Sequence, residues 1–153
     1  MIDKILKKEN IFIDAVPDKP VKDSAIELIS RLCSDAARVP WKPLKRAFME
    51  REAMDSTGFG EQLAIPHAKV KGLKNPMAAV IRFRDGVDWK SVDGIDVKVA
   101  IALIMPEGDK DNLHLMVLSK FARKLVHPEF MERLIAEKDP EALYSYIIKE
   151  MEE

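Results

Sequence analysis

The chain has 153 residues, of which 47% are hydrophobic and 33% are charged, as in an ordinary globular protein. Its 25 basic and 26 acidic side chains give a net charge of −1, so no basic stripe indicates nucleic-acid binding and no acidic tail indicates disorder. This length fits one domain, residues 1–153, with a sizeable hydrophobic core.

The first third of the chain predicts one strand followed by two helices. Alternating apolar residues predict a short strand over 10–15. Helical spacing of apolar residues predicts a helix over 21–38, with Asp23 or Ser24 as its N-cap. Pro40 ends that helix, and a second helix begins near Pro43 and runs to about residue 54.

The rest of the chain predicts three strands and then three helices. The strands are 63–66, 77–82 and 97–105, and the dipeptides Asp85-Gly86 and Asp93-Gly94 predict turns between the last two. Asp109 or Asp111 can cap a helix that reaches Leu125. Pro128 and Pro140 mark the starts of helices over 129–137 and 141–150. This order predicts an α/β fold with a central mixed β-sheet flanked by helices on both faces.

Three observations bear on where the protein works. The longest apolar run, 97–105, is interrupted by Lys98 and is far too short to cross a bilayer. The first residues lack the apolar stretch of a signal peptide. Cys33 is the single cysteine, which excludes an internal disulfide and fits a reducing compartment. We therefore expect a cytoplasmic protein that does not itself insert into a membrane.

The most informative stretch is 51–68, which places His67 directly after a short apolar run. Gly58 and Gly60 precede that run, and glycines in such a loop indicate a sharp turn or close approach to a ligand. A histidine at the end of a buried strand is held rigidly, while one edge of its ring can meet a partner. His67 is therefore a candidate nucleophile, although a structural role is also open.

The other two histidines admit plainer explanations. His127 precedes Pro128 between two helices, a position typical of a solvated cap or loop. His114 lies in the first turns of its helix, where it is either a partly buried helix residue or a group that helps to hold an anion at the helix N-terminus.

Other kinds of site have little support in the sequence. His67 and His114 are far apart in the sequence and lack Cys or carboxylate neighbours at ligand spacing, so we expect no metal. Cys33 lies in a predicted amphipathic helix, and we expect it to be a small core residue. No serine-hydrolase, P-loop or dinucleotide-binding motif is present, so we expect no cofactor.

Taken together, the motifs resemble the enzyme IIA component of the mannitol/fructose class (type 2) of the bacterial phosphoenolpyruvate-dependent sugar phosphotransferase system, almost from end to end. The matching segments, in order, are 9–14, Arg51-Glu52, Ser56-Thr57-Gly58-Phe59-Gly60-Glu61, Ala64-Ile65-Pro66-His67-Ala68, the turn 87–94 with its W-x-S-x-D-G pattern, Pro106-Glu107, and His114-Leu115. Gln62 departs from the family, which commonly has Gly there, so the local loop geometry is expected to differ.

The resemblance implies a phosphocarrier. His67 corresponds to the histidine that accepts a phosphoryl group from phosphohistidine on HPr and passes it to a cysteine of a IIB partner. His114 corresponds to the second active-site histidine, which stabilises the phosphorylated state, and Arg51 to an arginine that contacts phosphoryl oxygens. We further expect the backbone of Thr57, Gly58 and Gly60 to form a phosphate-binding loop.

The resemblance also implies association with a membrane permease complex. An apolar rim from Leu63, Ile65 and Phe59 is expected to shield the intermediate from water. Two functions fit the resemblance: uptake of a fructose-like sugar, and a nitrogen-type regulatory role in which the phosphorylation state controls other proteins. A binding module that has lost phosphorylation is a further alternative, against which the joint presence of His67, His114 and Arg51 argues.

Overall fold

A mixed, six-stranded β-sheet forms the centre of the computed structural model, which describes residues 2–108 and 112–152. Its strand order is β1-β5-β6-β3-β2, and β4 also pairs with β6. Neighbouring strands run parallel in the β1–β5, β3–β6 and β4–β6 pairs and antiparallel in the β5–β6 and β2–β3 pairs. The strands are β1 (Leu6–Ala15), β2 (Gly58–Gly60), β3 (Leu63–Ala64), β4 (His67–Val70), β5 (Met77–Val87) and β6 (Val97–Pro106).

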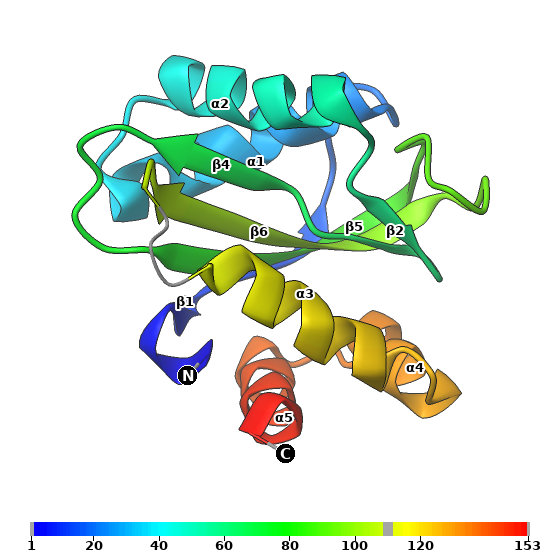
Figure 1. The fold of residues 1–153 in the computed structure, drawn as a ribbon. Coiled ribbons are helices and arrows are strands. Elements are labelled where there is room, and N and C mark those ends of the chain that lie inside the picture. The colour runs from blue at the N-terminus through cyan, green and yellow to red at the C-terminus, as the bar shows by residue number, and fades with distance from the viewer. Residues whose placement is uncertain (1, 109–111, 153) are drawn as a thin grey trace.

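Helices cover both faces of this sheet, which confirms the predicted α/β architecture (Figure 1). On one face lie α1 (Lys22–Ala37) and α2 (Trp41–Met54), which pack against each other, α1 on β5 and α2 on β4. On the other lie α3 (Leu113–Lys124), α4 (Pro128–Ala136) and α5 (Pro140–Glu152), with a 3-10 helix, η1 (Ile2–Lys4), beside α5.

Strand alternation divides the hydrophobic core into two layers. Leu63 and Ile65 belong to the cluster beneath α3, α4 and α5, whereas Ala64 and Ala68 belong to the cluster beneath α1 and α2. The central strands β5 and β6 are buried on both faces, which explains why the run 97–105 is almost continuously apolar. Cys33 is fully buried in the α1–α2 layer, as expected of a core residue.

Several predicted boundaries are wrong in instructive ways. The first strand begins at Leu6, earlier than predicted. The residues directly after Leu6 are polar and do not show an apolar alternation, but they can be exposed because β1 lies at the edge of the sheet. Asp85-Gly86 does not form a turn: β5 continues through it with a register shift against β6 between Arg82 and Val87. Gly86 is needed there because an added Cβ would lie 2.8 Å from the Cβ of Asp96.

The helix caps also differ from the prediction. The N-cap of α1 is Val21, which makes no side-chain capping bond, and Asp23 and Ser24 lie inside the helix. Asp109 and Asp111, the predicted caps of the next helix, lie outside the described residues, and Asn112 occupies the N-cap of α3. By contrast, α4 and α5 begin at Pro128 and Pro140, as predicted.

Candidate active site around His67

His67 is the first residue of β4, where the chain resumes pairing with β6 after Pro66. The carbonyl of Pro66 accepts a hydrogen bond from the Leu103 N–H at 2.9 Å, and His67 itself pairs in register with Leu103. Pro66 thus separates β3 from β4, so the predicted strand over 63–66 is divided and His67 starts a strand rather than ending one. Its side chain is only 5% exposed, and the sheet therefore holds the ring firmly.

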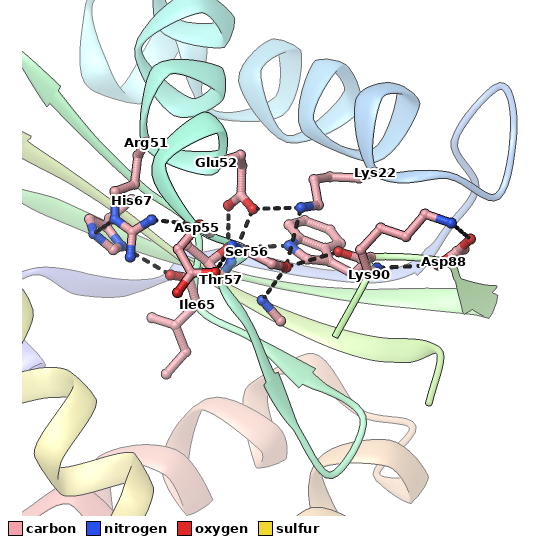
Figure 2. Close-up of polar contacts among 12 residues, drawn as sticks. Lys22, Arg51, Glu52, Asp55, Ser56, Thr57, Ile65, His67, Asp88 and Lys90 are labelled. Carbon is pink, nitrogen blue, oxygen red and sulfur yellow. Dashed lines mark hydrogen bonds and ion pairs between the residues drawn. The ribbon is translucent and has the colours of Figure 1, made fainter. Parts of the chain in front are cut away.

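Two hydrogen bonds define the protonation of the His67 ring. Nε2 accepts the Nε–H of Arg51 at 2.9 Å, and Nδ1 lies 3.1 Å from the carbonyl oxygen of Ile65. Because an arginine only donates and a carbonyl only accepts, this geometry assigns the proton to Nδ1 and leaves a lone pair on Nε2. The neutral ring therefore has an unprotonated Nε2, which the Arg51 N–H engages (Figure 2).

Arg51 approaches His67 from the last turn of α2. Its Nη1 donates to the carbonyl oxygen of Asp55 at 2.6 Å, just beyond the end of that helix. A cation is favourable at this position, because a helix C-terminus carries partial negative charge and unpaired carbonyls. The guanidinium is thus fixed by its own helix end while one N–H points at the His67 ring.

His114 stacks on the other side of this arrangement. It lies in the first turn of α3, half-buried, with its ring centroid 5.3 Å from that of His67 and the two planes inclined by 27°. Residues 51, 67 and 114, which are distant in the sequence, therefore converge at one place. His127, by contrast, is exposed at the start of α4, 3.9 Å from Glu129, as expected of a solvated residue.

The surroundings of His67 lower its pKa. Burial is the main cause, because the charged imidazolium loses hydration, and the neighbouring Arg51 and His114 act in the same direction. The Ile65 carbonyl and the Glu52 carboxylate oppose this effect but do not reverse it. His67 is consequently neutral near pH 7, the form in which Nε2 carries its lone pair.

An open pocket of about 330 Å³ gives access to the two histidines, and it is lined by Ala47, Glu50, Arg51, Met54, His67, Lys69 and His114. Exposed apolar side chains on α2 and α3 are Met54, Leu115 and Met116, with exposed fractions of 80%, 55% and 44%. Leu63 and Ile65 are fully buried, so the prediction that they form an apolar rim is wrong. Of that predicted rim only Phe59 reaches the surface, and it does not line this pocket.

The predicted phosphate-binding loop is engaged in other contacts. Thr57 donates both its N–H, at 3.0 Å, and its hydroxyl to the carboxylate of Glu52, and the Gly58 N–H donates to the Ser56 hydroxyl at 3.1 Å. Thr57, Gly58 and Gly60 do not line the pocket at His67. Gly58 and Gly60 form a short strand, β2, that pairs with β3, and phosphate binding by this loop stays a prediction.

Glu52 is the centre of a buried polar network that the sequence did not reveal. Its side chain is 2% exposed and forms an ion pair with Lys22 at 3.0 Å, in addition to its two bonds with Thr57. The Trp89 indole N–H donates to the Thr57 hydroxyl at 3.2 Å, and the Ser56 hydroxyl donates to the Trp89 carbonyl at 3.0 Å. Figure 2 shows this network running from α1 across the end of α2 to the segment before β2.

The W-x-S-x-D-G turn packs against the same hairpin. An added Cβ on Gly58 would lie 2.4 Å from the Ser91 hydroxyl oxygen, so the turn and the hairpin approach as closely as a glycine allows. The Asp93 carboxylate accepts hydrogen bonds from the backbone N–H groups of Glu61 and Ile95, and the first of these joins the turn to the hairpin. Gln62 has φ 69°, in the left-handed region where glycine is favoured. This backbone conformation is the one that the Gly common in the family would adopt with less strain.

Comparison with known proteins agrees with this fold and identifies the family. Residues 4–150 match the family described as "Phosphoenolpyruvate-dependent sugar phosphotransferase system, EIIA 2". A fructose-specific EIIA component from Haloferax volcanii is 30% identical over 132 residues, covering 86% of this chain and 85% of that protein. A fructose-specific EIIABC component from Bacillus subtilis is 31% identical over 146 residues, covering 95% of this chain, which spans only 23% of that protein's length.

Solved structures show the same fold. The nitrogen regulatory protein IIA-Ntr from Neisseria meningitidis superposes with a TM-score of 0.83 at 29% identity, covering 93% of this chain and 95% of that one. The mannitol IIA of Escherichia coli, in a complex with phosphorylated mannitol IIB, superposes with a TM-score of 0.73 at 18% identity, covering 97% and 99% of the two chains.

The chain is thus an α/β protein in which a buried, neutral histidine begins an edge strand of the mixed sheet. The chain belongs to the EIIA type 2 family of the phosphoenolpyruvate-dependent sugar phosphotransferase system. Within the described residues, every helix is too short or too polar to serve as a membrane span.

Proposed function

We propose that this protein accepts a phosphoryl group on Nε2 of His67 from phospho-HPr and passes it to a cysteine of a IIB component during uptake of a fructose-like sugar. One observation carries the proposal: a buried, neutral histidine directs an unprotonated nitrogen at an arginine beside an open pocket. The resemblance of the motifs to the family supports His67, His114 and Arg51 as the working residues.

The first step is an in-line displacement at phosphorus. The Nε2 lone pair forms the new N–P bond, the N–P bond to the HPr histidine breaks, and its electron pair returns to the donor nitrogen. The His67 ring becomes positively charged as it takes the phosphoryl group. The Ile65 carbonyl, which accepts the Nδ1–H, is placed to stabilise that charge without taking the proton.

Arg51 has two roles in the proposed step. In the resting state its Nε–H occupies the Nε2 lone pair, so the guanidinium must shift before phosphorus can approach. Once displaced, it can donate to phosphoryl oxygens, whose charge grows in the loose transition state. We propose that His114, which stacks on the same ring, stabilises the phosphorylated state. The proposed mechanism therefore uses these side chains and not the backbone of 57–60.

In the second step His67 is the donor and passes the phosphoryl group on to the IIB component. A IIB thiolate attacks the phosphoryl group, the N–P bond breaks and the electron pair returns to Nε2. The mannitol IIA structure is a complex with a phosphorylated IIB, which supports a IIB acceptor for a chain of this fold. We propose a cytoplasmic location and association with a membrane permease complex.

A second candidate function is nitrogen-type regulation, in which the phosphorylation state of His67 controls other proteins. The likeness to the IIA-Ntr structure from Neisseria meningitidis favours it, because the superposition covers nearly the whole of both chains. Both functions use the same first step and differ in what receives the signal. A module that binds partners without phosphorylation is the remaining alternative.

The test is phosphorylation with phosphoenolpyruvate, enzyme I and HPr, measured as intact mass. Wild type is expected to gain one phosphoryl group and His67→Ala none, while His127→Ala, a surface histidine, is expected to behave as wild type. Labelling of His67→Ala equal to wild type would remove His67 as the nucleophile. Onward transfer to a fructose-type IIB domain would favour transport, and its absence from a phosphorylated protein would favour regulation.

A further inference from the structure

Lys69 lies two residues beyond His67 on the same strand and shares its pocket. Side chains alternate along β4, so the fully buried Ala68 faces the core between them while His67 and Lys69 both line the pocket. Residues two apart on a strand are separated by about 7 Å, which the four-carbon stem of a lysine can span. The Lys69 side chain is exposed, and its ammonium makes no hydrogen bond or ion pair with the described residues.

The charges around the pocket indicate what Lys69 could contribute to the phosphorylated protein. A phosphoryl group on nitrogen or oxygen carries about two negative charges near neutral pH. Arg51 supplies one positive charge, and part of its donor capacity is already used by the Asp55 carbonyl. Glu50, which lines the same pocket from α2, is acidic and opposes a second negative group. The phosphorylated His67 ring supplies a second positive charge, so the ring and Arg51 together balance the phosphoryl group but leave the negative charge of Glu50 uncompensated. A further cation beside the group would restore the balance.

We propose that Lys69 is that cation: a residue that holds the phosphoryl group on His67 alongside Arg51, so that it stabilises the phosphorylated protein. This inference rests on the proposed function. Arg51 offers a planar fork fixed by its helix end, whereas Lys69 is a mobile point charge that can follow the group. Glu50 acts in the opposite sense, and the two side chains together set how readily the protein keeps its phosphoryl group.

The experiment measures the equilibrium between phospho-HPr and the phosphorylated protein, by intact mass at several HPr ratios. Lys69→Gln is expected to reduce the equilibrium constant about fivefold, the effect of losing one exposed ion pair. Glu50→Gln is expected to increase it, and Lys69→Arg to keep it near wild type. Lys71→Gln is the matched control, because it removes the same charge from a residue that lines a different cavity, beside the α1–α2 turn.

A second readout separates charge contact from a change in folding. Titration of the phosphoryl ³¹P resonance is expected to show a higher second pKa in Lys69→Gln than in wild type, because the dianion has lost a cation. If wild type is phosphorylated and Lys69→Gln matches it in both measurements, the Lys69 proposal fails while the proposed function stands. If wild type takes no phosphoryl group from phospho-HPr, both fail together.

Discussion

Replacing Glu52 by alanine should destabilise this protein more than any comparable change on the exposed face of α2. The carboxylate is almost completely buried, and it pairs with Lys22 and with two donors of Thr57. After truncation, the Lys22 ammonium, on a side chain 16% exposed, keeps the Ser56 hydroxyl at 3.2 Å as its one hydrogen-bond partner among the described residues. The Thr57 N–H also loses its partner in a buried position.

The magnitude follows from these losses. Removing one partner of a buried ion pair costs about 3–5 kcal/mol, and the residual exposure of Lys22 places this site at the lower end. We therefore expect Glu52→Ala to lower the free energy of unfolding by about 3 kcal/mol. For a domain of this size, that loss corresponds to a fall in Tm of roughly 6–12 °C.

Urea denaturation and thermal melting would measure the effect, with Glu50→Ala as the control. Glu50 lies on the same helix and is exposed, so its removal should change stability by less than about 0.5 kcal/mol. Adding Lys22→Met to Glu52→Ala should cost less than the sum of the two single changes, because the unpaired charge is then absent. Equal losses in Glu52→Ala and Glu50→Ala would refute the buried network.

Two further predictions concern pH and close packing. Because the folded pKa of His67 lies below its unfolded value of about 6.5, the unfolded chain binds more protons between these pKa values. The stabilising contribution of His67 should therefore be complete above about pH 6.5 and be lost as the pH drops through the folded pKa. Urea midpoints measured over this pH range should fall less for His67→Gln than for wild type, and parallel curves for the two proteins would contradict this. Gly58→Ala places a Cβ 2.8 Å from the Ser91 Cα and should cost about 2 kcal/mol in thermal unfolding, whereas an unchanged Tm would mean that the hairpin and turn can separate freely.

Local signals in the sequence predicted most elements of the fold. Period-2 and helical spacing located the central strands and the helices, and Pro128 and Pro140 marked two helix starts, because these signals depend on neighbouring residues alone. The same signals failed at Asp85-Gly86, where pairing with β6 and packing against Asp96 override a dipeptide that usually turns. The parallel pairing of β1 with β5 joins distant segments and leaves no local trace.

The sequence itself pointed to His67, whereas the roles of Arg51 and His114 beside it came from the resemblance. His67 stood out by its glycine-rich approach, but nothing in spacing brings Arg51 or His114 to it, since each comes from a different helix. The network around Glu52 was missed because Lys22, its ion-pair partner, and Trp89, which donates to Thr57, lie far from Glu52 in the sequence, one before it and one after it. Lys69 could have been noticed from strand alternation, since a residue two beyond His67 faces the same way.

The most direct test of the account is to identify the phosphorylated nitrogen by ¹⁵N and ³¹P NMR of the protein labelled on histidine. The structure predicts one phosphorylated residue, His67, with the group on Nε2 and a proton retained on Nδ1 beside the Ile65 carbonyl. A phosphoryl group on Nδ1 of His67, or on His114, would contradict the assignment of the nucleophile and the mechanism built on it.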